Sequence, residues 1–294
     1  MSRSRSSTQG GIAAVVGCAL AAFACTEAPE PIATITVGAD RVAVPLGAPL
    51  DLQFRFDVTP DLEHGLTEDY RVFVHFLDDR EEVLWTEDHD LPVPTSQWRS
   101  GQSIEYERRV KIPMYPYVGE SVIAAGLYSV VDGTRVPLAG VDLGQSAYRV
   151  ASIRLEPQHE SSFVAYGDGW HPAEFSGDGR RQWRWTSDRG VLSFRNPKRD
   201  SRLILEFDGR PDMFDAPQRL SLAIGDRVLR ELGVEGTEVI HLVEDLSATE
   251  LGAEDFIELE LRVDRTFTPA DIDSEAQDRR KLGVRVFYTY FEPL

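Results

Sequence analysis

Residues 50–58 read Leu-Asp-Leu-Gln-Phe-Arg-Phe-Asp-Val, with an apolar side chain at every second position. Successive side chains of a β-strand point to opposite faces, so this alternation predicts a strand with one buried and one solvated face. Further strands are predicted at residues 70–77, 104–112, 122–131 and 148–155. Short strands separated by loops rich in Pro, Gly and Asp predict an immunoglobulin-like β-sandwich over residues 32–156.

The second half of the chain repeats the all-β signal after a polar junction at residues 157–162. Strands are predicted at residues 203–207, 220–224, 239–243, 257–263 and 284–290. The connections between them are long, which suits a jelly roll better than a meander, so residues 157–294 are expected to form a jelly-roll-like sandwich. One helical turn is expected within residues 245–255.

Ahead of the first strand, residues 11–25 form an apolar, charge-free run behind an arm that carries Arg3 and Arg5. This layout is typical of an export signal, and the run is shorter than the roughly 20 residues that a lone membrane-spanning helix needs. The run ends in Ala-Phe-Ala-Cys, which resembles the lipobox of bacterial lipoproteins. The resemblance implies a cleaved signal peptide at residues 1–24, acyl chains such as palmitate on Cys25, and a tether at residues 25–31.

Two alternatives to lipidation at Cys25 remain open. Residues 15–18 also fit a lipobox, but lipidation at Cys18 would leave a very short apolar run before it. Ordinary cleavage would instead leave Cys25 as a free thiol. In the enterobacterial sorting pattern Thr26 favours the outer membrane over the inner one, so we expect a lipid-anchored protein of the bacterial cell envelope.

The composition limits the partners of the protein. The 294 residues are 42% hydrophobic and carry a formal net charge of −18, and loss of Arg3 and Arg5 with the signal peptide makes the chain more acidic. Such a surface repels phosphate backbones, so nucleic acid is excluded as a partner. Because Cys18 and Cys25 are the only cysteines, the expected mature body has no disulfide and no thiol nucleophile.

Several segments resemble accessory domains of bacterial envelope enzymes. In the first half they are residues 72–75, Trp98, Gly101, residues 126–128 and residues 132–135, and in the second half residues 169–174, 183–186, 267–270 and 278–283. The first set resembles sandwich domains appended to membrane glycosyltransferases. The second set resembles the non-catalytic, jelly-roll-like domain at the C-termini of some polysaccharide glycosyltransferases and phosphoglycerol transferases. The resemblance covers accessory domains alone, so it implies no enzymatic activity.

Three residues are candidates for contact with a sugar: Trp170, His171 and Glu174. Aromatic faces cover the apolar side of sugar rings, and carboxylates and guanidinium groups bind the hydroxyls. Large aromatic residues in sandwiches are more often core, and we assign Trp185 to the core. Asp278 and Arg280 are expected to form a structural ion pair that closes the loop before the last strand, with Glu174 as a further carboxylate partner.

The sequence offers no support for nucleophilic catalysis, and a pair of carboxylates for glycoside hydrolysis, distant in the chain and close in space, is left open as a weaker alternative. It contains neither a Gly-x-Ser-x-Gly elbow nor a His-Glu-x-x-His helix, so we expect no enzyme, no catalytic residue and no cofactor. Residues 271–275 and 87–90 are acidic runs, and each is more often a solvated turn than a calcium loop, so no metal site is assigned.

Two functions follow from these observations. The first is a lipid-anchored binding protein for envelope polysaccharide, acting through its C-terminal sandwich. The second is a scaffold or accessory subunit of an envelope complex for glycan assembly or export, acting through protein contacts. The exposure of the five tryptophans separates them, because a sugar-stacking surface requires an exposed aromatic face.

Overall fold

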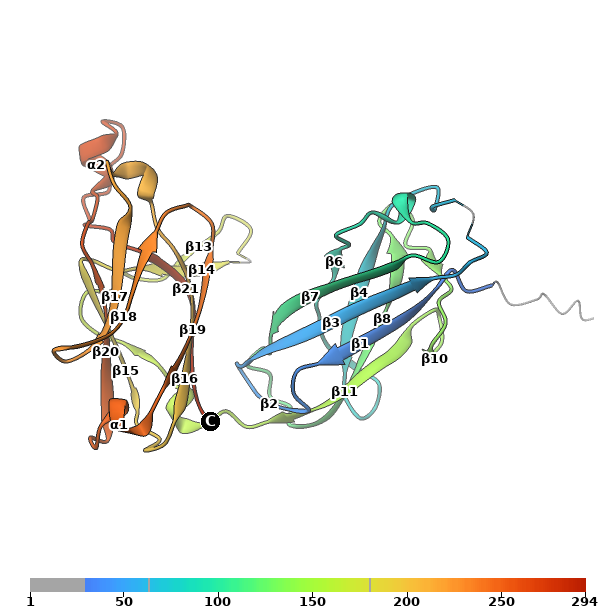
Figure 1. Cartoon of the computed structure of the whole chain (residues 1–294), viewed down its shortest axis with the longest axis horizontal. Helices are drawn as coiled ribbons and strands as arrows, with labels where there is room; N and C mark the ends of the chain where they lie inside the picture. Colours follow the sequence, from blue (N-terminus) through green and yellow to red (C-terminus); the bar gives the residue numbers. More distant parts are fainter. Residues whose placement is uncertain (1–29, 63, 180) are drawn as a thin grey trace, which may run out of the picture.

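A computed structural model describes residues 30–62, 64–179 and 181–294. The predicted signal peptide (residues 1–24), Cys25 and most of the predicted tether lie outside these residues. The described chain forms two β-sandwiches side by side, which confirms the predicted all-β class (Figure 1). Residue 30 lies at the end of the N-terminal sandwich remote from the second sandwich, and the C-terminus lies at the junction. No helix in the described residues is long and apolar enough to cross a membrane.

The N-terminal sandwich packs a three-stranded antiparallel sheet on a larger one. The first sheet has the order β1-β3-β7, and the second follows β10-β11-β8-β4-β5 with β2, β6 and β9 added at its sides. This division is immunoglobulin-like. The strands are β1 (Ala33–Ala39), β2 (Ala43–Pro45), β3 (Pro49–Val58), β4 (Tyr70–Leu77), β5 (Val83–Thr86), β6 (His89–Asp90), β7 (Ser103–Lys111), β8 (Gly119–Ser129), β9 (Arg135–Val136), β10 (Val141–Asp142) and β11 (Tyr148–Glu156).

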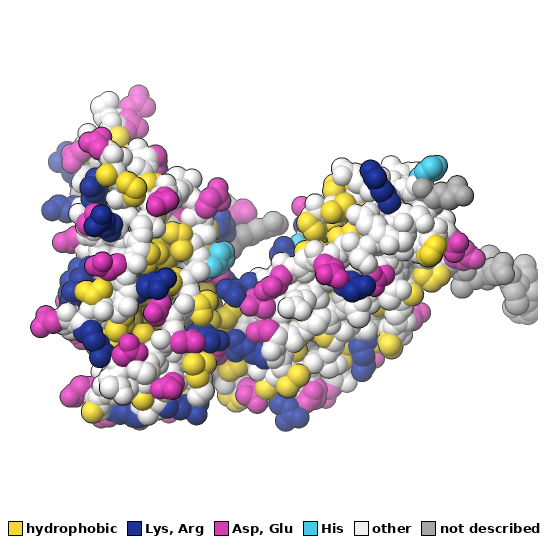
Figure 2. Space-filling model, viewed as in Figure 1, with side chains coloured by type: hydrophobic (Ala, Val, Ile, Leu, Met, Phe, Trp, Pro, Cys, Tyr) yellow, Lys and Arg dark blue, Asp and Glu magenta, His cyan; other side chains and the backbone are white. Residues whose placement is uncertain are grey.

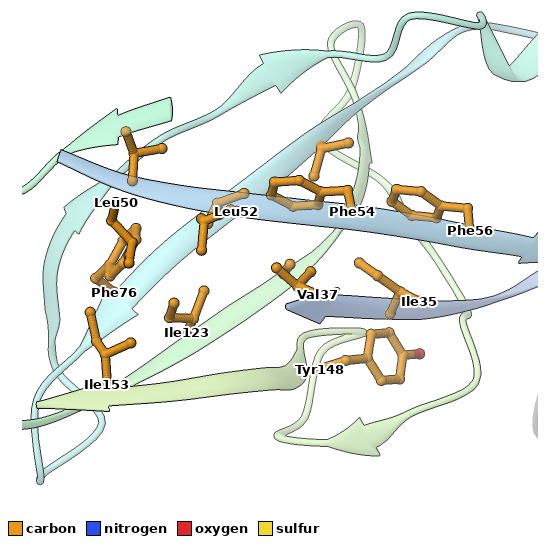
Figure 3. Close-up of a cluster of buried hydrophobic side chains, with 14 of the residues drawn as sticks. Ile35, Val37, Leu50, Leu52, Phe54, Phe56, Phe76, Ile123, Tyr148 and Ile153 are labelled. Atoms are coloured by element: carbon orange, nitrogen blue, oxygen red, sulfur yellow. The ribbon is translucent and has the colours of Figure 1, made fainter. Parts of the chain in front are cut away.

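The alternating stretch of residues 50–58 explains how this sandwich is held together. Its apolar side chains on β3 are buried and point towards Phe76, Ile123 and Ile153 of the facing sheet (Figure 3). The polar residues between them face solvent, where Arg109 donates to Asp51 on the neighbouring strand (Nη2 to Oδ2, 2.7 Å). Burial of one face of each sheet is the main stabilising contribution of the core.

The C-terminal sandwich consists of two five-stranded sheets. Their orders are β12-β15-β20-β17-β18 and β13-β14-β21-β16-β19, so from β14 onward the chain crosses between the sheets at every connection except the β17–β18 hairpin, as in a jelly roll. The strands are β12 (Ala165–Tyr166), β13 (Glu174–Phe175), β14 (Gln182–Trp185), β15 (Arg189–Arg195), β16 (Ser201–Asp208), β17 (Gln218–Ile224), β18 (Arg227–Val234), β19 (Ile240–Leu246), β20 (Phe256–Val263) and β21 (Arg285–Pro293).

Helices in the described residues are short. The expected turn within residues 245–255 is α1 (Ala248–Leu251), which begins at a capping box between Ser247 and Glu250. A second turn, α2 (Pro269–Ile272), lies in the loop before the last strand. Three single 3₁₀ turns are η1 (Thr95–Gln97), η2 (Glu160–Ser162) and η3 (Pro211–Met213).

The core between the two C-terminal sheets is built from the inward faces of β15, β16, β17, β20 and β21.

The two sandwiches meet at a seam. Ile204 and Tyr290 project from the outer face of the sheet β13-β14-β21-β16-β19 and join the hydrophobic core cluster of the N-terminal sandwich. Arg41 donates to Glu292 (Nη1 to Oε2, 3.0 Å), and the Tyr288 hydroxyl donates to the carbonyl of Gly47 (2.5 Å). Figure 2 shows hydrophobic side chains together with acidic and basic ones where the sandwiches meet, and a similar mixture over both sandwiches in this view.

Candidate functional site

Trp170 is tied into the sandwich that it belongs to. It is half-buried, and its indole Nε1 donates to the carbonyl of Val191 (2.8 Å). The ring of Tyr166 packs edge-on against the indole, with 4.9 Å between ring centroids. The polar group of Trp170 is therefore already satisfied, and its ring is partly covered.

His171 and Glu174 both bind the segment before the last strand. His171 Nε2 lies 2.9 Å from the carbonyl of Lys281, to which it donates as the protonated ring nitrogen. One oxygen of Glu174 accepts from Arg280 (Nη1 to Oε1, 2.7 Å) and the other from the indole of Trp183 (3.0 Å). Both carboxylate oxygens thus have partners within the protein.

Asp278 and Arg280 form the ion pair that their spacing suggests. Arg280 donates from Nη2 to Asp278 Oδ2 (2.6 Å) and from Nε to Oδ1 (2.9 Å). These bonds hold the pKa of Asp278 at about 2. Next to the pair, Leu282 and Trp185 are buried in a small cluster with Phe267. The arrangement fixes the loop that contains α2 against the outer face of the sheet.

None of the five tryptophans, all of which lie in the described residues, is exposed. Trp98 and Trp185 are buried, and the other three, Trp85, Trp170 and Trp183, are half-buried. Each of the five tryptophans therefore has at most part of its ring in contact with solvent.

A different group of side chains gathers on the outer face of the sheet β13-β14-β21-β16-β19. We call Arg181, Trp183, Asp208, Arg285 and Phe287 the aromatic–arginine cluster. The Arg285 guanidinium lies 4.9 Å from the ring centroid of Phe287 and 5.3 Å from that of Trp183. It also lies 5.5 Å from the ring of the buried Trp185. Cationic groups over aromatic faces are attracted by the ring quadrupole.

Phe287 lies in this cluster next to a β-bulge. It follows Arg285 by two positions, so regular alternation places both side chains on the outer face, where Phe287 contacts Arg285 and Trp183, and Val286 between them is buried in the core. Along β16 and β21, Glu206 pairs with Tyr288 and the next residue, Phe207, pairs with Val286, so β21 has one extra residue here. The bulge places Tyr288 on the outer face as well, where its hydroxyl contacts the N-terminal sandwich.

Asp208 fixes the orientation of Arg285. The buried carboxylate accepts two bonds, from Nε (3.0 Å) and from Nη2 (2.6 Å) of Arg285. Such two-point pairing sets the guanidinium plane. Arg285 Nη1 has no partner among the described residues, and 30% of the side chain remains exposed, so this edge can donate to a ligand.

The cluster lies between two covered regions of one sheet face. On one side, the loop with α2 covers Trp185 through Phe267. On the other side, the N-terminal sandwich covers the neighbouring pair of residues on β16 and β21, Glu206 and Tyr288, where Lys111 pairs with Glu206 and lies over the ring of Tyr288 (4.5 Å). The cluster is thus the uncovered strip beside the seam, a common position for ligand sites.

The two acidic runs are engaged in ordinary contacts. In residues 271–275, Asp273 Oδ1 accepts the backbone N–H of Glu275 (2.9 Å), and in residues 87–90, Asp88 Oδ1 accepts that of Val74 (3.2 Å). No group of three or more His, Cys, Asp or Glu side chains suited to a metal ion is found in the part of the chain that the structure describes.

Comparison with known proteins assigns no family, since no family model and no curated protein matches the chain. Among solved structures, the Bacteroides ovatus mixed-linkage glucan protein SGBP-B in complex with a heptasaccharide is 9% identical, with a TM-score of 0.28. That match covers 85% of this chain and 51% of SGBP-B. The C-terminal CBM6 of the Zobellia galactanivorans laminarinase LamC is 11% identical (TM-score 0.27), over 44% of this chain and 99% of that one.

A third match is the Pseudomonas fluorescens alkylpurine DNA glycosylase AlkC bound to DNA, at 13% identity and a TM-score of 0.28. It covers 42% of this chain and 30% of the glycosylase. The neighbours thus include carbohydrate-binding modules beside a DNA-repair enzyme. TM-scores this low assign neither a shared fold nor a ligand to this protein.

Proposed function

We propose that this protein is a non-catalytic, lipid-anchored component of the bacterial cell envelope whose C-terminal sandwich binds polysaccharide at the aromatic–arginine cluster. The observation that supports binding is Arg285, which a buried carboxylate holds among three aromatic rings with Nη1 left to donate. Sugar rings combine an apolar face with hydroxyl groups, so they match an aromatic surface with fixed donors.

The proposed location has a separate basis. Export and lipid attachment rest on the apolar run of residues 11–25 and on Cys25, as the sequence presents them. Lipid attachment is tested by the intact mass of the native product, which should correspond to a chain that begins at Cys25 and carries acyl groups. A native product that still begins at Met1 and carries no lipid contradicts it.

Binding is tested with the detergent-solubilised full chain on immobilised polysaccharides. We expect retention on at least one polymer, and we expect Phe287→Ala to weaken binding roughly three- to tenfold, because an aromatic contact contributes about 0.5–1.5 kcal/mol. Phe256→Ala is the matched control, since Phe256 is an exposed phenylalanine of the opposite sheet. Retention that Phe287→Ala and Phe256→Ala reduce equally excludes the cluster as the site.

A second candidate function is supported by one surface feature. The loop between β7 and β8 exposes the apolar side chains of Met114, Tyr115 and Val118, and exposed apolar patches are typical of protein contacts. An accessory subunit of a glycan assembly or export complex would use such a surface. This function predicts co-purification with a specific envelope protein that a Met114→Ser/Val118→Ser variant loses and Phe287→Ala keeps.

A further inference from the structure

Two guanidinium groups flank one aromatic ring in the cluster. The ring centroid of Phe287 lies 4.9 Å from Arg285 Cζ and 4.8 Å from Arg181 Cζ. The charge of Arg285 is balanced by Asp208, whereas Arg181 is exposed and makes no ion pair with any described residue. The site therefore offers the donor fork of Arg181, the Nη1 group of Arg285 and one cationic charge beyond its own carboxylate.

The other nearby carboxylates are already engaged. Glu174 accepts from Arg280 and Trp183, and Asp278 accepts from Arg280. Neither carboxylate pairs with Arg181, because the partners of both are other residues. Asp178, in the same turn as Arg181, accepts from the Ser176 hydroxyl (2.5 Å). An incoming anion would therefore meet guanidinium donors at this ring, with Glu174 and Asp278 already paired.

The chemistry of a matching ligand follows from these positions. A guanidinium fork pairs best with a planar carboxylate, through two parallel hydrogen bonds. In a uronic acid the carboxylate is bonded directly to the sugar ring, so a carboxylate that pairs with the guanidinium groups over Phe287 brings the sugar ring next to the Phe287 ring. A neutral sugar would satisfy the aromatic surface and leave Arg181 without a charged partner.

The net charge of the protein limits how dense the negative charge of the ligand can be. With a formal net charge of −18, the protein repels a polymer that carries a negative charge on every sugar unit. Charges in solvent are screened beyond about 8 Å at physiological salt, so a single carboxylate in contact with Arg181 and Arg285 is attracted locally. A mostly neutral chain with occasional uronic acid residues satisfies both conditions.

We infer that the sugar recognised at the aromatic–arginine cluster is a uronic acid, whose carboxylate pairs with Arg181 and Arg285 while its ring contacts Phe287 beside them. This inference rests on the proposed polysaccharide-binding function and names the ligand class of the same site.

The test compares matched trisaccharides by calorimetry on the detergent-solubilised full chain at physiological salt. They contain one glucuronic acid residue, its methyl ester, glucose in its place, or glucose 6-phosphate in its place. We expect the free acid to bind about tenfold or more tightly than the ester and the glucose form, because hydrogen bonds to charged groups are stronger than neutral ones. The phosphate form should bind less tightly than the acid.

Two variants link this preference to the site. Arg181→Gln should bind the acid no better than the ester, and Arg285→Lys, which keeps a cation beside Asp208, should reduce the preference for the acid. The control is Arg230→Gln, an exposed arginine on β18 of the opposite sheet, which should leave the preference unchanged.

The outcomes separate the two proposals. Equal binding of acid and ester that Phe287→Ala weakens overturns the uronic acid inference and leaves polysaccharide binding in place. A phosphate form that binds as tightly as the acid also overturns the assignment to a carboxylate. Absence of binding to all four sugars, and to every immobilised polysaccharide, overturns both proposals.

Discussion

The imidazole of His89 is buried between the sheets of the N-terminal sandwich. Its Nδ1 lies 3.0 Å from the carbonyl of Glu87, its Nε2 lies 2.8 Å from the Tyr106 hydroxyl, and the ring packs edge-on against Phe54. Burial lowers the pKa of His89 from 6.5 to about 4, because the charged imidazolium loses its hydration. His89 is therefore neutral in the folded protein where the unfolded chain would already bind a proton.

We predict that this residue destabilises the protein as the pH falls from about 6.5 towards 4. As the pH falls, the unfolded chain binds the proton before the folded protein does. The free energy of unfolding is therefore unaffected by His89 above the unfolded pKa and decreases by up to about 3 kcal/mol as the pH falls through this window. Thermal unfolding between pH 7 and pH 5 tests the prediction. His89→Gln cannot titrate, so its melting temperature should fall less over the window, while the exposed-site control His64→Gln should follow the wild type. Identical profiles for the wild type and His89→Gln contradict the prediction.

Residue spacing was enough to predict one local contact near the site. Asp278 and Arg280 lie two positions apart on one short segment, and this local geometry was enough to suggest their ion pair. The clamp between Asp208 and Arg285 joins residues 77 positions apart, and nothing in either local segment indicates it. Long-range pairs of this kind depend on which strands become neighbours, and a single sequence does not encode that in any short pattern.

At the scale of elements, β4 and β8 show why some glycines are fixed by packing. Phe73 is buried on the outer face of its sheet, where Arg135 Cζ lies 4.1 Å from the ring centroid. Gly126 pairs directly with Phe73, and a Cβ there would lie 2.6 Å from the Phe73 ring and 2.6 Å from the carbonyl oxygen of Ser146. These residues belong to segments that resemble accessory sandwich domains, and here they serve packing between strand and loop.

We predict that Gly126→Ala destabilises the N-terminal sandwich. An added methyl group would force the Phe73 ring or the loop with Ser146 to move, and overpacking of this kind costs about 1–3 kcal/mol. Gly177→Ala is the control, because a Cβ at Gly177 meets no atom within 4 Å. Chemical unfolding should place the midpoint of Gly126→Ala clearly below that of Gly177→Ala. Coincident midpoints would show that Phe73 and the loop with Ser146 move without lowering the free energy of unfolding, which contradicts the prediction.

Period-two alternation predicted the strands better than it predicted the site. It was sufficient for β3, β17 and β20, whose inward residues follow the pattern without interruption or nearly so. It failed for Tyr288 and Tyr290, because a bulge adds one residue to β21 and places both side chains on the outer face together with Arg285 and Phe287. A bulge depends on the partner strand, so the sequence analysis, which named Trp170, gave no sign that Phe287 and Tyr288 lie on one face.

At the scale of the whole molecule, charged pairs bridge the seam between the sandwiches. Arg41 pairs with Glu292 and Lys111 pairs with Glu206, and both carboxylates are buried. A buried carboxylate that loses its cation is left uncompensated, and this is costly. The seam therefore couples the two sandwiches through charge as well as through Ile204 and Tyr290.

We predict that in the double variant Arg41→Ala/Lys111→Ala the two sandwiches unfold independently. Two carboxylates at the seam would lose their cationic partners, so the seam should open, and calorimetry should resolve two unfolding transitions where the wild type shows one. X-ray scattering should give a larger radius of gyration. Arg55→Ala/Arg154→Ala is the control, because it removes three exposed ion pairs within the N-terminal sandwich, those of Arg55 with Asp57 and Glu105 and that of Arg154 with Glu120. One transition and unchanged dimensions in both variants would mean that apolar contacts alone hold the seam.

The seam also sets the reach of the molecule. The described chain enters at the end of the N-terminal sandwich that points away from the seam (Figure 1). If the protein is attached at that end, the length of the first sandwich sets the distance from the point of attachment to the aromatic–arginine cluster, and the seam sets the orientation of the cluster. The first sandwich would then act as a rigid spacer that presents the second to polymers some distance from the point of attachment.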